Sequence, residues 1–161
     1  MKFKNKFKEY CKNNPEWALN EDRIGRQTCI DNIPTFIDEI EYIEEHPDKY
    51  DIDLIAYDNE DNIFTYIEAE HSNSWTTTSF PYKRMNVPLR KKKFFIKYPG
   101  SLYVMVNKDS TCMGVVHSED ILNSYIKEVS NKYNKKGEYF YSVSLEHIDF
   151  YELHYNKSPN H

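Results

Sequence analysis

The sequence has few of the features that mark secreted, membrane-bound or zinc-dependent proteins. Its three cysteines, Cys11, Cys29 and Cys112, are widely spaced and form no CxxC pair, which argues against a disulfide framework or a zinc site. No stretch approaches the roughly 20 apolar residues that span a membrane. The lysine-rich beginning has no apolar run after it and does not resemble a signal peptide. We therefore expect a cytoplasmic protein with reduced thiols and no membrane partner.

Glycine and paired histidines are also scarce. The four glycines form no phosphate-binding loop, and we find no internal repeat or low-complexity segment. His117, His147 and His154 have neither the spacing of metal ligands nor an evident nucleophile partner. These absences argue against a P-loop nucleotide site and against serine–histidine–aspartate catalysis.

Charge is abundant and unevenly distributed. The chain has 161 residues, a hydrophobic fraction of 39% and a net charge of −5, which together indicate one globular domain. Residues 38–61 carry eleven acidic side chains and one lysine, whereas residues 83–97 carry seven basic side chains and no acid. An acidic centre beside a basic segment suits a metal site that handles a polyanion.

The central stretch of the sequence predicts a β-hairpin. Residues 50–57 and 63–70 are rich in Ile, Leu, Phe and Tyr, and the polar residues 58–62 between them have the composition of a turn. Because side chains alternate across a strand, Glu68 and Glu70 should share one face, and Asp51 and Asp53 should share one face of the partner strand. We expect three or four carboxylates to converge if these faces coincide.

Such a carboxylate cluster has two interpretations. Neighbouring carboxylates raise one another's pKa and oppose folding unless a cation compensates them. A hard divalent ion such as Mg²⁺ takes oxygen ligands from a few carboxylates and would remove the repulsion. Alternatively, the hairpin lies at the sheet edge and its acids face solvent.

The remaining pattern predicts an α/β fold with a mixed central β-sheet flanked by helices on both faces. The single domain, 1–161, divides into an N-terminal helical extension (1–31), a core (32–107), C-terminal strands with a helix (108–155) and a loose tail (156–161). We expect helices at 2–13, 32–46 and 87–97. A further helix should begin at Ser118, since apolar residues continue at helical spacing to Val129. We expect strands at 101–107, 111–116, 137–144 and 148–153.

Several residues are candidates for contacts with nucleic acid. Trp75 lies in a polar loop, where it could stack on a base, although packing of the loop onto the domain is the expected role. Arg90 and Lys91 open the expected helix at 87–97, so we rank them above Lys92 and Lys93 as phosphate ligands. Lys83 and Arg84 belong to the same basic segment. The alternative is an ordinary solvated surface.

The segment Asp53-Leu-Ile-Ala, a turn, and then Tyr66-Ile-Glu68-Ala-Glu70 resembles the core motif of the PD-(D/E)XK nuclease superfamily, which has the restriction-endonuclease-like fold. Asp53 matches the first acid and Glu68 the second. Glu70 stands where the motif has lysine, as in a minority of type II restriction endonucleases. Alternatively, the lysine role has moved to the following helix, to Arg90 or Lys91. The resemblance covers residues 32–107.

The resemblance implies an Mg²⁺-dependent (or Mn²⁺-dependent) endonuclease that hydrolyses phosphodiester bonds, most simply in DNA. Asp53, Glu68 and Glu70 would hold the metal, Glu70 or Lys91 would orient the attacking water, and Arg90 with Lys91 would clamp phosphate oxygens. Cutting both strands of a duplex would favour a homodimer. Two alternatives stay open: a nuclease-like fold without hydrolysis that binds nucleic acid or protein, and a small interaction protein with a merely acidic surface.

Overall fold

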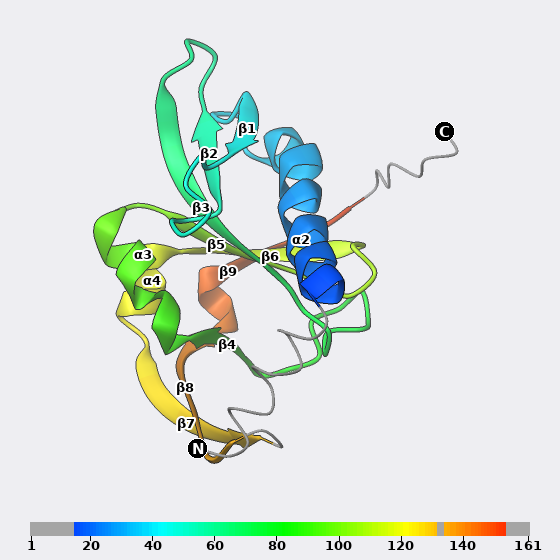
Figure 1. Cartoon of the computed structure of the whole chain (residues 1–161), viewed down its shortest axis with the longest axis vertical. Helices are drawn as coiled ribbons and strands as arrows, with labels where there is room; N and C mark the ends of the chain where they lie inside the picture. The colour runs from blue at the N-terminus through cyan, green and yellow to red at the C-terminus, as the bar shows by residue number, and fades with distance from the viewer. Residues whose placement is uncertain (1–14, 132–133, 154–161) are drawn as a thin grey trace.

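The computed structural model describes residues 15–131 and 134–153 and forms two β-sheets with few helices (Figure 1). The larger sheet is mixed, with the order β1-β2-β3-β5-β6-β9, and the smaller is antiparallel, with the order β4-β8-β7. This confirms the α/β class and the mixed central sheet. The elements are α2 (Pro15–Phe36), β1 (Tyr42–Glu45), β2 (Leu54–Tyr57), β3 (Ile63–His71), β4 (Arg84–Pro88), η1 (Leu89–Lys91), α3 (Lys92–Lys97), β5 (Leu102–Val106), β6 (Cys112–His117), α4 (Ser118–Leu122), β7 (Tyr125–Asn131), β8 (Asn134–Ser144), η2 (Leu145–His147) and β9 (Ile148–Glu152).

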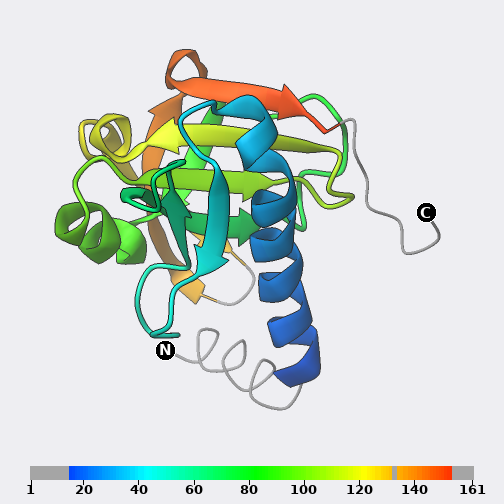
Figure 2. The same cartoon turned by 90° about the horizontal axis from the view of Figure 1, so that it is seen from above.

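Helix α2 covers one face of the six-stranded sheet (Figure 2). Cys29 and Ile33 are one helical turn apart and face the sheet, where they join a buried cluster with Leu54, Ile67 and Val104. Neighbouring strands are antiparallel except β3 and β5, which are parallel and joined through the segment that contains β4 and α3. The β1–β2–β3 meander and the parallel strand β5 thus form the part of the sheet that lies under α2.

The opposite face of the sheet carries a second core. It is a buried apolar cluster to which the three-stranded sheet, α3, α4 and strands β5, β6 and β9 contribute: Met85, Val87, Tyr141, Val143, Phe95, Ile121, Tyr103, Val116 and Ile148. Because alternate residues of β4 and β8 enter this core, the other residues of these strands form a second face of the small sheet.

Three helix predictions were wrong in extent or type. Residues 32–46 divide into the end of α2 and strand β1, whose Ile43 pairs with Ala56 of β2. Residues 87–97 begin as strand, because buried Val87 pairs with Tyr141, and become helical only after Pro88. Beyond Ser118, α4 ends at Leu122, and the rest of the expected helix pairs with β8 as strand β7. In each case strand pairing overrides a helix-like spacing of apolar residues.

The expected strands at 101–107, 111–116, 137–144 and 148–153 correspond to β5, β6, β8 and β9. The expected hairpin is also present, although β2 is shorter than predicted and begins at Leu54. The predicted boundary between 31 and 32 falls inside α2, and the helix expected at 2–13 lies outside the described residues.

Two further findings concern thiols and membranes. Cys29 and Cys112 are buried free thiols, and burial raises the pKa of both. Both side chains therefore pack in the interior of the protein.

Across 15–131 and 134–153, no helix has the length and apolar character required to cross a bilayer.

The loop between β3 and β4 is held by Trp75, whose side chain is 0% exposed and donates from Nε1 to the carbonyl of Ser79 at 3.0 Å. The indole makes edge contacts with Phe80 and Phe150. Trp75 is therefore wrong as a candidate for stacking on a base, because its side chain is fully buried, and the expected packing role is the one that the structure has.

We predict that Trp75→Ala lowers the free energy of unfolding by about 3–5 kcal/mol, since it removes a large buried ring and leaves a cavity. Urea denaturation followed by circular dichroism measures this difference. Tyr50→Ala is the control, because Tyr50 is 79% exposed and its truncation should change stability by no more than about 0.5 kcal/mol. Equal effects of the two substitutions would contradict the packing role.

Candidate functional site

Strand pairing brings Asp53 and Glu68 together. Leu54 pairs with Ile67, so Asp53 lies opposite Glu68 at the point where β2 begins. The Asp53 backbone N–H donates to Glu68 Oε1 at 3.3 Å, and Asp53 Oδ2 accepts a hydrogen bond of 2.9 Å from the backbone N–H of Ala69. These bonds tie the first acid to the strand that carries the second.

Lys91 supplies a cation to this pair of acids. It comes from η1, the turn that follows β4, and its Nζ lies 2.6 Å from Glu68 Oε2. Both residues are buried, with relative exposures of 7% for Lys91 and 5% for Glu68. The structure thus brings two acids that are 15 positions apart together with a lysine that follows Glu68 by 23 positions.

Burial and charge act on the protonation of the pair in opposite directions. Burial raises the pKa of the Glu68 carboxyl to about 7, although the Lys91 ammonium pulls it down. Burial lowers the pKa of Lys91, but the carboxylates of Glu68 and Glu70 outweigh it, so the net shift is upward. Lys91 therefore stays protonated at neutral pH and acts as a hydrogen-bond donor, whereas Glu68 exchanges its proton near neutrality.

Glu70 lies two residues further along β3, on the same face as Glu68. In the parallel register of β3 and β5, Tyr103 lies beside Glu68 and Met105 beside Glu70, and the Tyr103 hydroxyl reaches along the sheet and donates to Glu70 Oε2. Tyr103 is 0% exposed, and burial together with the Glu70 carboxylate raises its pKa well above the usual value. The hydroxyl thus keeps its proton and fixes the Glu70 carboxylate.

A further acid, Asp22 of α2, lies near this cluster. Helix α2 crosses β3 closely at Gly25, where an added Cβ would be 3.3 Å from the backbone nitrogen of His71. Burial raises the pKa of Asp22, and the carboxylates of Asp53 and Glu70 act in the same direction. Sequence reasoning missed Asp22 because its segment shows weak apolar periodicity; the small residue Gly25 one turn later was the available signal.

Asp51 does not lie with Asp53, Glu68 and Glu70, so the expected convergence of four carboxylates is wrong. Its Oδ2 accepts hydrogen bonds from Lys97 Nζ at 2.6 Å and from the Tyr98 hydroxyl at 2.8 Å. Burial raises the pKa of Asp51, but these donors and the Ile52 backbone N–H prevail and lower it to about 2. Asp51 precedes the paired part of β2, so strand alternation does not govern its direction.

The basic candidates are found in different environments. Arg90, Lys92, Lys93 and Lys83 are exposed, whereas Lys91 is buried and pairs with Glu68. Arg84 is half-buried, and its guanidinium donates from Nε to Ser142 Oγ at 2.8 Å and from Nη2 to the Ser142 carbonyl. Among these candidates, Lys91 is the one that contacts the acids.

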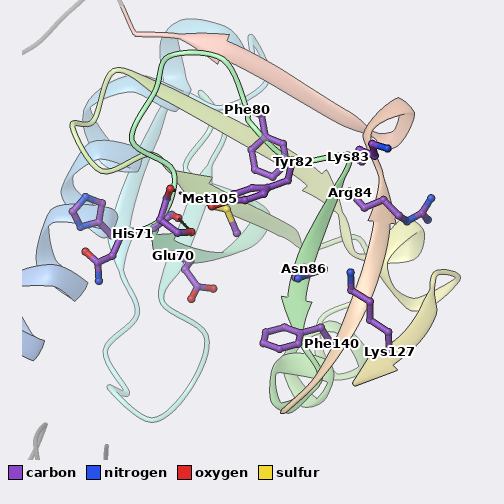
Figure 3. A pocket seen from close by; sticks show the side chains of 13 residues that line it. Glu70, His71, Phe80, Tyr82, Lys83, Arg84, Asn86, Met105, Lys127 and Phe140 are labelled. Atoms are coloured by element: carbon purple, nitrogen blue, oxygen red, sulfur yellow. Dashed lines mark hydrogen bonds between the residues drawn. The ribbon is translucent and has the colours of Figure 1, made fainter. Parts of the chain in front are cut away.

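A cavity of about 720 Å³ opens beside Glu70 (Figure 3). Glu70 and Met105 of the large sheet lie on one side, and residues of the small sheet, including Asn86, Lys127 and Phe140, lie on the other. Of the three candidate acids Asp53, Glu68 and Glu70, Glu70 is the one that lines this cavity between the two sheets.

We tested whether these residues suit a divalent cation. Carboxylate oxygens of Asp53, Glu68 and Glu70 are the ligand type that Mg²⁺ and Mn²⁺ prefer. However, in the described part of the chain no group of three or more His, Cys, Asp or Glu side chains is arranged to hold a metal. In this structure Lys91 Nζ and the Asp53 N–H occupy the Glu68 carboxylate oxygens. The three carboxylates are thus chemically suitable ligands for a divalent cation, and a bound cation would compete with Lys91 for the Glu68 carboxylate.

Comparisons of the chain with protein-family models, with curated proteins and with solved structures found no match.

We predict that Lys91→Met lowers the free energy of unfolding by about 3–5 kcal/mol at pH 8, because it leaves Glu68 buried without its cation. The loss should shrink at pH 5, where Glu68 takes up a proton. Urea denaturation at both pH values measures it. The double variant Glu68→Gln/Lys91→Met should recover much of the loss.

Lys97→Met is the matched control for that substitution. Lys97 makes an ion pair of the same 2.6 Å length with Asp51, but its side chain is 60% exposed. Its loss should lower stability far less than the loss of Lys91, because solvent screens an exposed ion pair. A loss for Lys91→Met as small as that for Lys97→Met would contradict a buried pair.

We also predict that Glu68 lowers stability as pH rises from about 4.5 to about 7. Its carboxyl pKa is 4.5 when unperturbed and about 7 in the folded chain, so the folded state binds more protons in this window. Unfolding free energies measured between pH 4 and 8 should fall more steeply in the wild type than in Glu68→Gln. Asp51 titrates between about 2 and 3.8 and does not interfere.

Carboxyl ¹³C NMR gives a direct check of this titration. One glutamate midpoint near 7 should be present in the wild type and absent in Glu68→Gln. A Glu68 midpoint close to 4.5 would show that burial does not control this carboxyl.

Proposed function

We propose that the protein is a metal-dependent nuclease of the PD-(D/E)XK type that hydrolyses phosphodiester bonds, with DNA as the expected substrate. One observation carries the proposal: Lys91 reaches Glu68 at 2.6 Å and joins Asp53 there. The sequence motif has Glu70 in place of its lysine. A lysine from a later segment restores the combination of two acids and one cation that the motif requires.

The order of the elements supports the same proposal. Helix α2 is followed by the three antiparallel strands β1, β2 and β3. After β4, which belongs to the small sheet, and η1, the short helix α3 leads to β5, which is parallel to β3. Asp53 precedes the second of these strands, and Glu68 lies in the third. This order is similar to the one that the resemblance to the restriction-endonuclease-like fold leads us to expect, and it supports the proposal.

The chemical roles follow from protonation. Lys91 keeps its proton at neutral pH, so it suits donation to a phosphate oxygen or to the attacking water and does not suit the role of general base. Glu70, held by the Tyr103 hydroxyl, faces the cavity and can accept a proton from that water. Exposed Arg90 follows Leu89 in η1 and can neutralise a substrate phosphate at the rim.

Asp53, Glu68 and Glu70 would hold the metal, with Asp22 as a further acid nearby. When bound, a divalent cation lowers the pKa of a water and neutralises charge that develops on the scissile phosphate. Lys91 would then be released from Glu68 and become available to substrate, since both cations compete for the same carboxylate.

A second candidate function is a nuclease-like fold that binds nucleic acid without hydrolysis. The observation that favours it is the engagement of Glu68 by Lys91 and by the Asp53 N–H, which leaves no preformed three-carboxylate group in the described residues. In that case Lys91 neutralises a buried acid permanently.

We predict that the wild type cleaves end-labelled DNA in the presence of Mg²⁺ or Mn²⁺, and that Asp53→Asn, Glu68→Gln and Lys91→Met each reduce the rate by roughly 100-fold or more. Denaturing gel electrophoresis of the products measures the rate. Lys97→Met should retain the wild-type rate, because Lys97 pairs with Asp51 away from the cluster.

Calorimetry separates the two candidates. A nuclease should bind Mn²⁺ in the wild type, alone or with a short oligonucleotide present, and lose this binding in Glu68→Gln. Oligonucleotide binding with neither Mn²⁺ binding nor cleavage would favour the binding module and refute the nuclease.

A further inference from the structure

The cavity beside Glu70 is lined on one side by the outer face of the small sheet. Asn86 pairs with Ser142, and Phe140 pairs with both Pro88 and Lys127. Residues that pair across antiparallel strands share a face, so Asn86, Phe140 and Lys127 project to one side. This side is opposite to Met85 and Val87, which enter the second core. The small sheet thus uses one face for folding and presents the other to the cavity.

Aromatic rings meet the cavity from two directions. Phe140 is half-buried and projects into it from β8, and Tyr82, which is 47% exposed, approaches from the loop before β4 (Figure 3). Phe80 lies behind Tyr82, with their ring centroids 5.5 Å apart. Accessible rings of this kind can stack on any nucleobase that is not covered by its neighbours.

The cavity is also lined by Asn86, whose side-chain oxygen Oδ1 is buried and has no hydrogen-bond partner among the described residues. A buried polar oxygen of this kind requires a donor from a ligand or from water. An asparagine amide both donates and accepts, as the hydrogen-bonding edge of a base requires.

The charge of the lining favours an anion. Lys83, Arg84 and Lys127 line the cavity, and Glu70 is the only acid among its described lining residues. Ser142 anchors the Arg84 guanidinium, which also lies 4.9 Å from the Tyr125 ring centroid, so this cation has a fixed position. These three cations lie across the cavity from Glu70 (Figure 3). A nucleic-acid strand bound in the cavity would therefore have phosphates near the cations and continue toward Glu70.

We propose that this cavity binds an unpaired nucleotide, so that the preferred substrate is single-stranded nucleic acid or an unpaired segment adjoining the cut site. The proposal rests on the proposed nuclease function and specifies its substrate. A volume of about 720 Å³ suits a ligand of one or two nucleotides. Inside a duplex the faces of each base are covered by its neighbours, so Phe140 and Tyr82 can stack only on a base that has left the duplex.

The test is fluorescence anisotropy in EDTA, where cleavage is suppressed, with a labelled 12-nucleotide single strand and the matching duplex. The wild type should bind the single strand at least about 10-fold more tightly. Phe140→Ala should weaken single-strand binding by roughly 5-fold or more, because stacking of one base contributes about 1–3 kcal/mol. Phe140→Leu, which retains apolar volume, should weaken it too and guards against a folding defect.

Two matched controls define the site. Tyr139→Ala removes a neighbouring, 52% exposed ring of β8 that projects to the opposite face and pairs with Glu128, and it should leave binding unchanged. Lys127→Ala should reduce the slope of log affinity against log salt by about 0.7, as expected for one lost phosphate contact with a single strand. Lys92→Ala, at an exposed position outside the cavity lining, should not reduce this slope.

The outcomes separate the cavity from the catalytic cluster. Equal or tighter duplex binding, or single-strand binding that Phe140→Ala leaves unchanged, would overturn the cavity assignment even if Glu68→Gln abolishes cleavage. Single-strand binding that depends on Phe140 and Lys127, without metal-dependent cleavage, would support the cavity and refute the nuclease. No binding of either probe would also overturn the assignment.

Discussion

The ion pair between Lys91 and Glu68 is the interaction on which the arrangement of the site depends. Both groups lose most of their hydration, which opposes folding unless each compensates the other at short range. Well-packed apolar side chains at these positions would in general stabilise a core as well or better. The proposed chemistry therefore explains the buried Lys91–Glu68 pair better than a contribution to stability does. The pair also requires that η1, which carries Lys91, keep a fixed position relative to β3, which carries Glu68.

The two-sheet architecture provides that fixed relation. Strand β4 leads directly into η1, and Met85 and Val87 anchor β4 in the second core against Tyr103. The same strand presents Asn86 to the cavity on its other face. One short strand thus positions Lys91 toward the acids and builds a side of the cavity. Through this double role, packing of the small sheet controls both the protonation of Glu68 and access to Glu70.

The protonation states give the site a defined resting arrangement. Lys91 and the Tyr103 hydroxyl keep their protons at neutral pH, whereas Glu68 lies near its midpoint. A divalent cation and the Lys91 ammonium are alternative partners for the same carboxylate. The proposed nuclease function therefore requires that a divalent cation displace the Lys91 ammonium from the buried Glu68 carboxylate.

The sequence alone determined the features that depend on local pattern. It placed the hairpin with Asp53 and Glu68, the buried strand β5 and the mixed sheet, because alternation and apolar runs are local properties of strands. It also ranked Lys91 among the candidates for a displaced lysine. Only the tertiary structure decided that Val87 and Tyr125 belong to strands and that Asp22 approaches the acids. These outcomes depend on pairing and burial between distant segments, which no local spacing encodes.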